Sequence, residues 1–242
     1  LEPWYLEQKH FHEELARELG YATVWELKHA VAATIGEYVH GGGFLFAMCS
    51  ATDTIDIALA WLSTDIVPSP FDNTPYDPNY RSQVDFTQTF AFQDFKLTTN
   101  PMIYEFSDLD TSNYAMMRGA MADYFTLFAF AAKYDPVPAM LTQNHVNVIN
   151  GFLGQTTGYN RRHLKRSVTV LAAVDGTDEV KYIHGKRGMG TWTFLGGHDP
   201  EDYQHRVGDP PTDLDLYPTS PGYRLILNNV LFPAARKKPQ KT

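Results

Sequence analysis

Apolar residues recur at intervals of two to five positions along residues 3–19, and Gly20 follows where this pattern stops. Such spacing places the apolar side chains on one broad face of a helix. A second helical pattern covers residues 23–39 and ends at a run of three glycines. We therefore expect residues 1–40 to form a helical lead-in to the rest of the chain.

Short apolar runs further along the chain predict the strands of a sheet. Residues 44–48 are continuously apolar, and the amphipathic run 53–61 follows after a few small residues, so we expect a strand, a sharp turn and a helix. Residues 168–174 and 191–195 are rich in β-branched and aromatic side chains and predict two more strands, the first followed by a hairpin-like turn at 175–176. The remaining expected elements are strands at 86–97, 123–130 and 138–142, short helices at 114–122 and 146–152, and a closing helix that begins at Ser220 and Pro221.

This order of elements predicts an α/β fold in which a mostly parallel sheet is flanked by helices. We expect one α/β domain over residues 41–235. Its proline-rich segment 67–80 is typical of a surface excursion, either an insert over the sheet or a contact for a protein partner. Residues 236–242 form a basic tail after the last helix.

The single cysteine of the chain, Cys49, directly follows the predicted strand 44–48. A sharp turn between a strand and a helix lifts a nucleophile out of the sheet edge, at the amino terminus of the helix. The helix dipole there favours the thiolate, which is the reactive form of cysteine. The structural alternative is a buried free thiol at the end of a core strand, a common place for cysteine.

A second candidate residue, His198, follows the predicted strand 191–195, and the carboxylates Asp199 and Glu201 come after it. If both strands end at the same edge of the sheet, they deliver a cysteine and a histidine as nucleophile and base. A nearby carboxylate would orient the imidazole; we assign this role to Glu201, with Asp199 in reserve. The alternative is a histidine that caps a turn among solvated acids.

Further residues complete the predicted site. Backbone N–H groups at Gly43 or Ser50 are candidate oxyanion donors, although a purely structural turn also explains the glycine run. Asp53, four residues after the cysteine, is a candidate to line the substrate site. The polar run Gln143, Asn144 and His145 ends an apolar segment, where it lines the site or, alternatively, caps a helix.

Composition limits the classes of function. With 43% apolar and 14% aromatic side chains, 242 residues can bury a sizeable core. The net charge of −8 argues against binding of nucleic acid, which needs a basic face. No window approaches eighteen consecutive apolar residues, so no transmembrane segment is expected. One cysteine excludes an internal disulfide. The acidic residues after His198 match no calcium loop, and His184, His198 and His205 with carboxylates are an alternative zinc set whose spacing nothing fixes, so we expect neither metal nor cofactor.

The order of an elbow cysteine and a late strand ending in histidine resembles the class I glutamine amidotransferase-like superfamily. Residues 167–172 and the glycines before His198 are similar to its trehalose-utilisation-type branch. Most of the chain looks like the carboxyl-terminal part of a bacterial family labelled asparagine synthetase B. The stretches that carry this resemblance are GGGFLFAMCSATD at 41–53, MLTQNH at 140–145, GGHDPEDYQH at 196–205 and SPGYRLILNNVLFPAA at 220–235.

The resemblance implies a flavodoxin-like fold that lacks its amino-terminal portion, because the family is longer there. The chain also departs from the superfamily pattern. Ala51 and Asp53 replace the Gly and Gln of Cys-x-Gly-x-Gln, and Asp199 separates His198 from the usual Pro-Glu. The sequence has no Ser-Gly-Gly-x-Asp-Ser stretch of an ATP pyrophosphatase, so the chemistry in the family label is not expected.

Two functions remain in view. One is an amidotransferase-like cysteine hydrolase or acyl-transfer domain with a small amide or acyl substrate. The other is a catalytically silent binding or scaffold subunit of a bacterial cell-envelope complex, which contacts a protein through residues 67–80. The family resemblance favours the bacterial periplasm or cell envelope over the cytoplasm.

Overall fold

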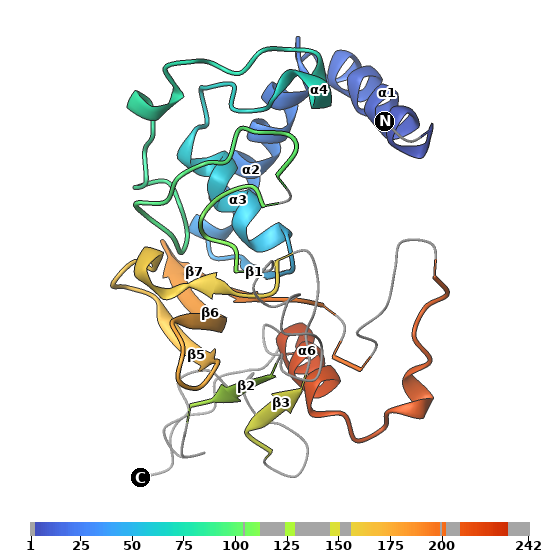
Figure 1. Ribbon diagram of the computed structural model, residues 1–242, viewed down its shortest axis with the longest axis vertical. Coiled ribbons are helices and arrows are strands. Elements are labelled where there is room, and N and C mark those ends of the chain that lie inside the picture. The colour runs from blue at the N-terminus through green and yellow to red at the C-terminus, as the bar shows by residue number, and fades with distance from the viewer. Residues whose placement is uncertain are drawn as a thin grey trace.

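The computed structural model describes residues 3–103, 105–111, 124–128, 146–150, 156–198, 200–201 and 209–231. The helices are α1 (Pro3–Glu18), α2 (Val24–His40), α3 (Ala51–Ala60), α4 (Ser69–Asp72) and α6 (Pro221–Leu231), with 3-10 helices η1 (Tyr80–Ser82), η5 (Arg161–His163) and η6 (Leu214–Leu216). The strands are β1 (Phe44–Met48), β2 (Tyr124–Leu127), β3 (Val148–Asn150), β4 (Tyr159–Asn160), β5 (Thr169–Ala173), β6 (Glu179–Arg187) and β7 (Gly190–Leu195). Figure 1 shows their arrangement.

The two predicted amino-terminal helices are confirmed as α1 and α2. A capping box begins α2: the Thr23 hydroxyl accepts a hydrogen bond from the Glu26 N–H, and the Glu26 carboxylate accepts one from the Thr23 N–H at 3.0 Å. The closing helix is confirmed as α6, where the Ser220 hydroxyl accepts a hydrogen bond from the N–H of Tyr223 at 3.3 Å. None of the helices in the described ranges is long and apolar enough to cross a bilayer.

The described strands form one sheet in the order β1-β7-β6-β5-β2-β3, with β4 paired to β6. The expectation of a mostly parallel sheet is wrong for this part of the chain: β1 and β7 are parallel, and every other described pair is antiparallel. The physical reason is that tight turns connect β5 to β6 and β6 to β7. Gly176 and Gly188 give these turns their positive φ angles of 73° and 57°, and such short connections reverse the direction of the chain.

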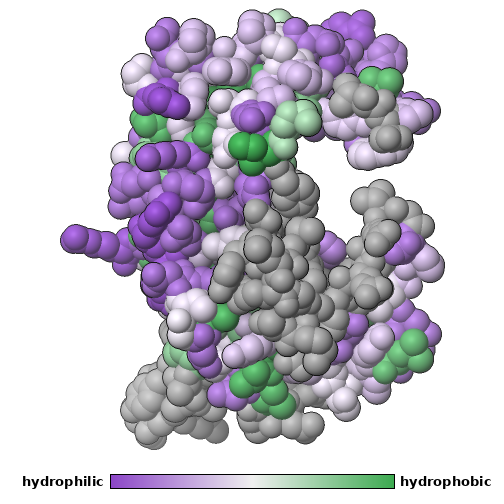
Figure 2. All heavy atoms as spheres, in the orientation of Figure 1, coloured by the Kyte–Doolittle hydropathy of each residue, from purple (hydrophilic) through white to green (hydrophobic). Residues whose placement is uncertain are grey.

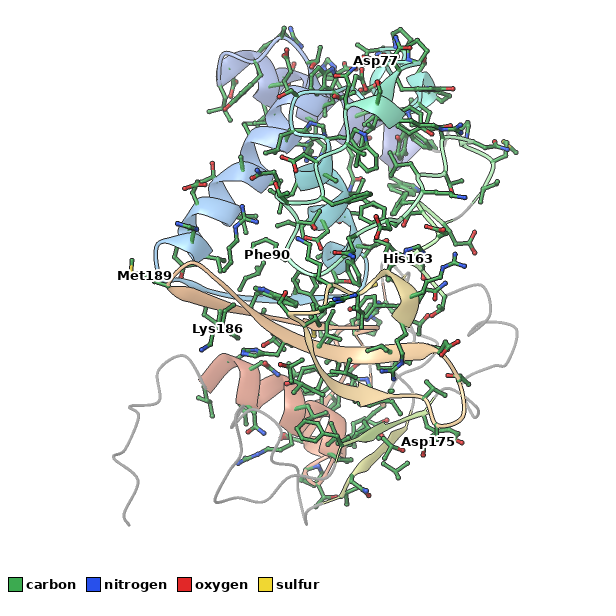
Figure 3. The ribbon with its side chains drawn as sticks, turned by 90° about the vertical axis from the view of Figure 1, so that its left-hand side faces the viewer. Asp77, Phe90, His163, Asp175, Lys186 and Met189 are labelled. Atoms are coloured by element: carbon green, nitrogen blue, oxygen red, sulfur yellow. The ribbon has the colours of Figure 1, made fainter. Side chains whose placement is uncertain are left out.

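Helices lie on both faces of this sheet, as the sequence predicts. On one face, α2, α3 and the loop 84–97 pack against Trp192 and Phe194 of β7. On the other face, Leu225 of α6 joins Leu195 and residues of β2 and β5 in a second core. Figure 3 shows the sheet between the two helical layers. Alternate side chains of β7 thus pack into the two cores on opposite faces of the sheet, because successive residues of a strand point to opposite faces.

The strand expected at 86–97 is instead a loop. Its aromatic residues are buried or half-buried, but the backbone N–H groups of Phe90, Ala91 and Phe92 donate to the carboxylate of Asp56 at 2.6, 2.7 and 2.9 Å. A buried side chain on α3 therefore replaces a neighbouring strand as the hydrogen-bond acceptor. The helix expected at 146–152 is also wrong in its described part, which forms β3. The expected elements at 114–122 and 138–142 lie outside the described residues.

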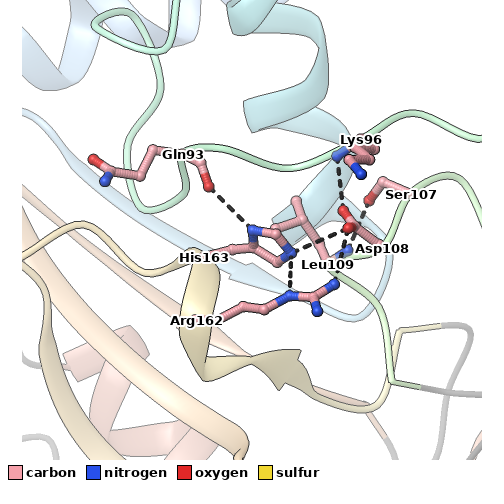
Figure 4. A network of polar contacts seen from close by, with 7 residues as sticks. All are labelled: Gln93, Lys96, Ser107, Asp108, Leu109, Arg162 and His163. Atoms are coloured by element: carbon pink, nitrogen blue, oxygen red, sulfur yellow. Dashed lines mark hydrogen bonds and ion pairs between the residues drawn. The ribbon is translucent and has the colours of Figure 1, made fainter.

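Two residues of η5, Arg162 and His163, form polar contacts with the segments that contain Gln93 and Asp108 (Figure 4). The Arg162 side chain donates to Nε2 of His163 at 3.0 Å and to the carboxylate of Asp108 at 3.0 Å. The buried His163 ring also contacts the main-chain carbonyl of Gln93 at 3.3 Å. Because Arg162 is already paired with the Asp108 carboxylate, we assign it a structural role.

Candidate active site

Cys49 adopts a backbone conformation that few residues other than glycine tolerate. Its φ is +54°, and the other described non-glycine residues with positive φ are Asn73 and Asp94, two residue types that accept this region readily. Such strain costs about 1–3 kcal/mol and persists only where the surrounding structure enforces it. Here the Cys49 N–H donates to the carbonyl of Leu195 at 3.1 Å, and the Thr52 N–H and hydroxyl donate to the Cys49 carbonyl at 3.1 and 2.6 Å.

The parallel pairing of β1 and β7 explains how Cys49 meets His198. Met48 is the register partner of Leu195, so both strands end at the same edge of the sheet. Gly197 follows β7 with φ of +75° and turns the chain before His198. The half-buried imidazole forms a side-chain hydrogen bond with the Cys49 thiol. The structure therefore brings together the two residues that the sequence proposes as nucleophile and base.

The surroundings of the thiol favour its ionised form. Burial raises the pKa of Cys49, but the hydrogen bond with His198 and the backbone N–H groups of Thr156 and Ser50 lower it, as does the charge of His198. The net result is a pKa below the ordinary value of a thiol. A thiolate that already faces two N–H donors and an imidazole is suited to attack a carbonyl carbon.

Of the two residues predicted as oxyanion donors, one lies at the sulfur and the other does not. Ser50 lies where the sequence predicts it, with its N–H at the sulfur. Gly43 does not: it precedes β1, at the opposite end of the strand. The five residues of β1 lie between it and Cys49, a distance of about 20 Å. The second N–H at the sulfur belongs to Thr156, which the sequence analysis missed because nothing local marks it.

The structure does not show either predicted acid in contact with His198. Glu201 is half-buried, and its carboxylate forms no hydrogen bond or ion pair within the described ranges. No contact therefore supports its proposed orienting role. Asp199, Gln143, Asn144 and His145 lie outside the described residues, so their roles stay predictions.

Asp53 lies behind the cysteine, inside the protein. It is fully buried, and its Oδ1 accepts a hydrogen bond from the Thr156 hydroxyl at 3.1 Å. Burial raises the pKa of Asp53 well above its usual range, and the negative charge of Asp110 raises it further. Burial also raises the pKa of Tyr159, whose hydroxyl lies near Asp53 and Asp110. Asp53 is thus placed to support the site from the interior and does not line a surface that a substrate reaches.

Within the described ranges, no group of three or more histidine, cysteine or acidic side chains is arranged to hold a metal ion. The atoms that converge on the Cys49 sulfur are one imidazole and two N–H groups. This set matches nucleophilic chemistry on an acyl group, with the N–H groups placed to stabilise negative charge.

Comparison with known proteins adds little to this geometry. No family model and no curated protein matches the chain. One solved structure, a cytoplasmic protein from Salmonella typhimurium LT2, aligns with 14% sequence identity and a TM-score of 0.39. The alignment covers 85% of this chain and 61% of that protein. A similarity of this size identifies neither a fold family nor a function for the chain.

Proposed function

We propose that this chain is a cysteine-dependent hydrolase or acyl-transfer domain of the amidotransferase-like kind, acting on a small amide or acyl substrate. The observation that carries the proposal is Cys49 at φ +54°, hydrogen-bonded to His198 and facing the N–H groups of Ser50 and Thr156. The parallel pair β1–β7 supports the proposal, because it brings both residues to the carboxyl ends of two neighbouring strands.

The proposed reaction proceeds through a thioester. The Cys49 sulfur attacks the carbonyl carbon of the substrate, and the thiol proton passes to His198. As the sulfur gives up its negative charge to the new bond, the carbonyl oxygen becomes an oxyanion, and the N–H groups of Ser50 and Thr156 move their hydrogen bonds from the sulfur to this oxygen. The tetrahedral intermediate collapses, the bond to the leaving group breaks, and the leaving amine takes the proton from His198.

A second half-reaction frees the enzyme. His198 accepts a proton from a water molecule as the water oxygen attacks the thioester carbonyl. The carbon–sulfur bond then breaks, a carboxylic acid leaves, and Cys49 recovers its proton. In acyl transfer, an amine or alcohol takes the place of the water. Glutamine is not the substrate we expect, because Asp53 occupies the position of the usual glutamine and its carboxyl is buried.

Acylation of the protein by a small p-nitrophenyl ester tests the proposal. Intact-mass measurement should show one acyl group on the wild type, none at this site in Cys49→Ala, and slower acylation in His198→Ala. His10→Ala is the matched control, since this histidine is exposed and pairs only with acids of α1 among the described residues. The wild-type adduct should then decay as water hydrolyses the thioester. Acylation that is equal in the wild type and in Cys49→Ala would contradict the proposal.

A separate observation favours the second function, a binding or scaffold subunit of a cell-envelope complex. An apolar cavity of about 260 Å³ lies beside α3; Cys49 does not line it, and the proline-rich segment forms part of its wall. On the face that Figure 2 shows, apolar side chains otherwise form small separate groups among polar ones. A silent subunit would keep this cavity but would have a thiol of ordinary reactivity. The main lining residues are Ile57, Ile66, Val67, Pro68, Phe71, Leu97, Ile103 and Phe106.

A further inference from the structure

Thr156 connects the three segments that build the proposed site. Its N–H donates to the Cys49 sulfur, and its hydroxyl donates to Oδ1 of Asp53 at 3.1 Å. Its carbonyl accepts a hydrogen bond from the N–H of Gly197 at 2.7 Å, directly before His198. The residue is completely buried. One threonine therefore links the turn after β1, the first turn of α3 and the chain after β7.

The hydroxyl of Thr156 restrains the residue whose N–H faces the sulfur. The residue stands in an irregular segment next to the end of β7, so no helix or strand orients it. The Gly197 contact fixes its carbonyl, and the Asp53 contact fixes its side chain. Without the second contact the residue can rotate, and its N–H no longer needs to face the sulfur.

The form of Asp53 that suits this task is the neutral acid. The backbone N–H groups of Asp53 and Thr54 favour its ionised form, but complete burial outweighs them, and its Oδ2 meets no hydrogen-bond partner within the described ranges, which makes a charge on that oxygen costly. The titratable groups that act on Asp53 or are acted on by it are Asp110 and Tyr159, and Cys49 in turn acts on Tyr159. A charged Asp53 would also disfavour the thiolate, whereas a neutral carboxyl accepts the Thr156 hydroxyl without that effect.

We propose that Asp53 and Thr156 are positioning residues of the Cys49 site: a neutral Asp53 carboxyl holds the Thr156 side chain, which keeps the Thr156 N–H on the sulfur. This inference rests on the proposed function, because it assumes that the thiolate is the working form of Cys49. Neither side chain touches the substrate, so both act through the geometry of one backbone N–H group.

The pH dependence of Cys49 alkylation by iodoacetamide tests this inference, and the single cysteine makes the signal unambiguous. Thr156→Val keeps the shape of the side chain but removes its hydroxyl. We expect the apparent pKa of the thiol to rise by about one unit, which slows alkylation near pH 6 about tenfold. Thr156→Ser should restore most of the wild-type profile, and so should Asp53→Asn, which mimics the neutral acid.

Thr64→Val is the matched control, since Thr64 is a buried threonine beyond the far end of α3 that donates to Gln83 at 2.9 Å. It should alter thermal stability without moving the alkylation profile. An unchanged profile in Thr156→Val would overturn the inference, and a lower thiol pKa in Asp53→Asn would show that Asp53 is charged and also overturn it. If Thr156→Val does not fold, Asp53→Ala takes its place, with the same rise expected. His198→Ala distinguishes the proposed function from the positioning role of Asp53 and Thr156, because its effect on the thiol pKa tests the proposed function alone.

Discussion

Asp56 provides a quantitative test of the fold because one carboxylate replaces a whole strand as acceptor for the loop 84–97. Asp56→Ala leaves the N–H groups of Phe90, Ala91 and Phe92 without their acceptor. Each buried N–H without a partner costs about 1–3 kcal/mol, or about 3–9 kcal/mol for the three. Removal of the buried charge offsets this loss, because burial raises the pKa of Asp56 to about 6. The charge therefore lowers the free energy of unfolding by about 3 kcal/mol at pH 7. We expect a net loss of about 3 kcal/mol.

Thermal unfolding at pH 7 measures this loss. For a chain of this length, about 3 kcal/mol corresponds to a fall of about 6–12 °C in Tm. Asp85→Ala is the control: Asp85 lies in the same loop and accepts the N–H of Thr87 at 2.9 Å, but it is exposed, so its loss should change Tm little. An Asp56→Ala protein that unfolds within 2 °C of the wild type would refute the view that this carboxylate fixes the loop.

Two further predictions concern the titration of Asp56 and the space around Gly196. Since the folded pKa of Asp56 is about 6 and the unfolded value about 4, the folded state binds the proton more tightly. The stability difference between wild type and Asp56→Ala in urea unfolding should therefore grow by about 2 kcal/mol as pH falls from 6 to 4; a constant difference would contradict the pKa. At Gly196, an added methyl group would overlap the main-chain carbonyl of Thr157. Gly196→Ala should thus raise the alkylation pKa of Cys49, whereas Gly176→Ala, in a remote turn, should not; equal profiles would refute this.

The parts of the site that the sequence predicts are those fixed by local pattern. A continuous apolar run followed by small residues specifies β1 and the turn at Cys49, because strand and helix periodicities change at that point. The aromatic and β-branched run of β7 places His198 in the same way. The parallel pairing of two apolar strands then brings both residues to one edge of the sheet.

The parts that the sequence does not predict depend on contacts between distant segments. The hydrogen bond from Thr156 to Asp53 spans 103 positions, and no periodicity marks either partner. The loop 84–97 shows the alternation of a strand because its aromatic residues are buried or half-buried, yet its N–H groups bond to a helix side chain. Hairpin connections made the sheet mostly antiparallel, although the turn at 175–176 was visible in the sequence.

Alkylation of Cys49 by iodoacetamide over a range of pH, in the wild type and in His198→Ala, tests the central claim most directly. The thiolate–imidazole pair predicts an apparent pKa below the ordinary thiol value of about 8.5, which rises when His198 is removed. A thiol with an ordinary pKa, or one that does not respond to the loss of His198, would contradict the proposed active site and leave the binding function as the account to pursue.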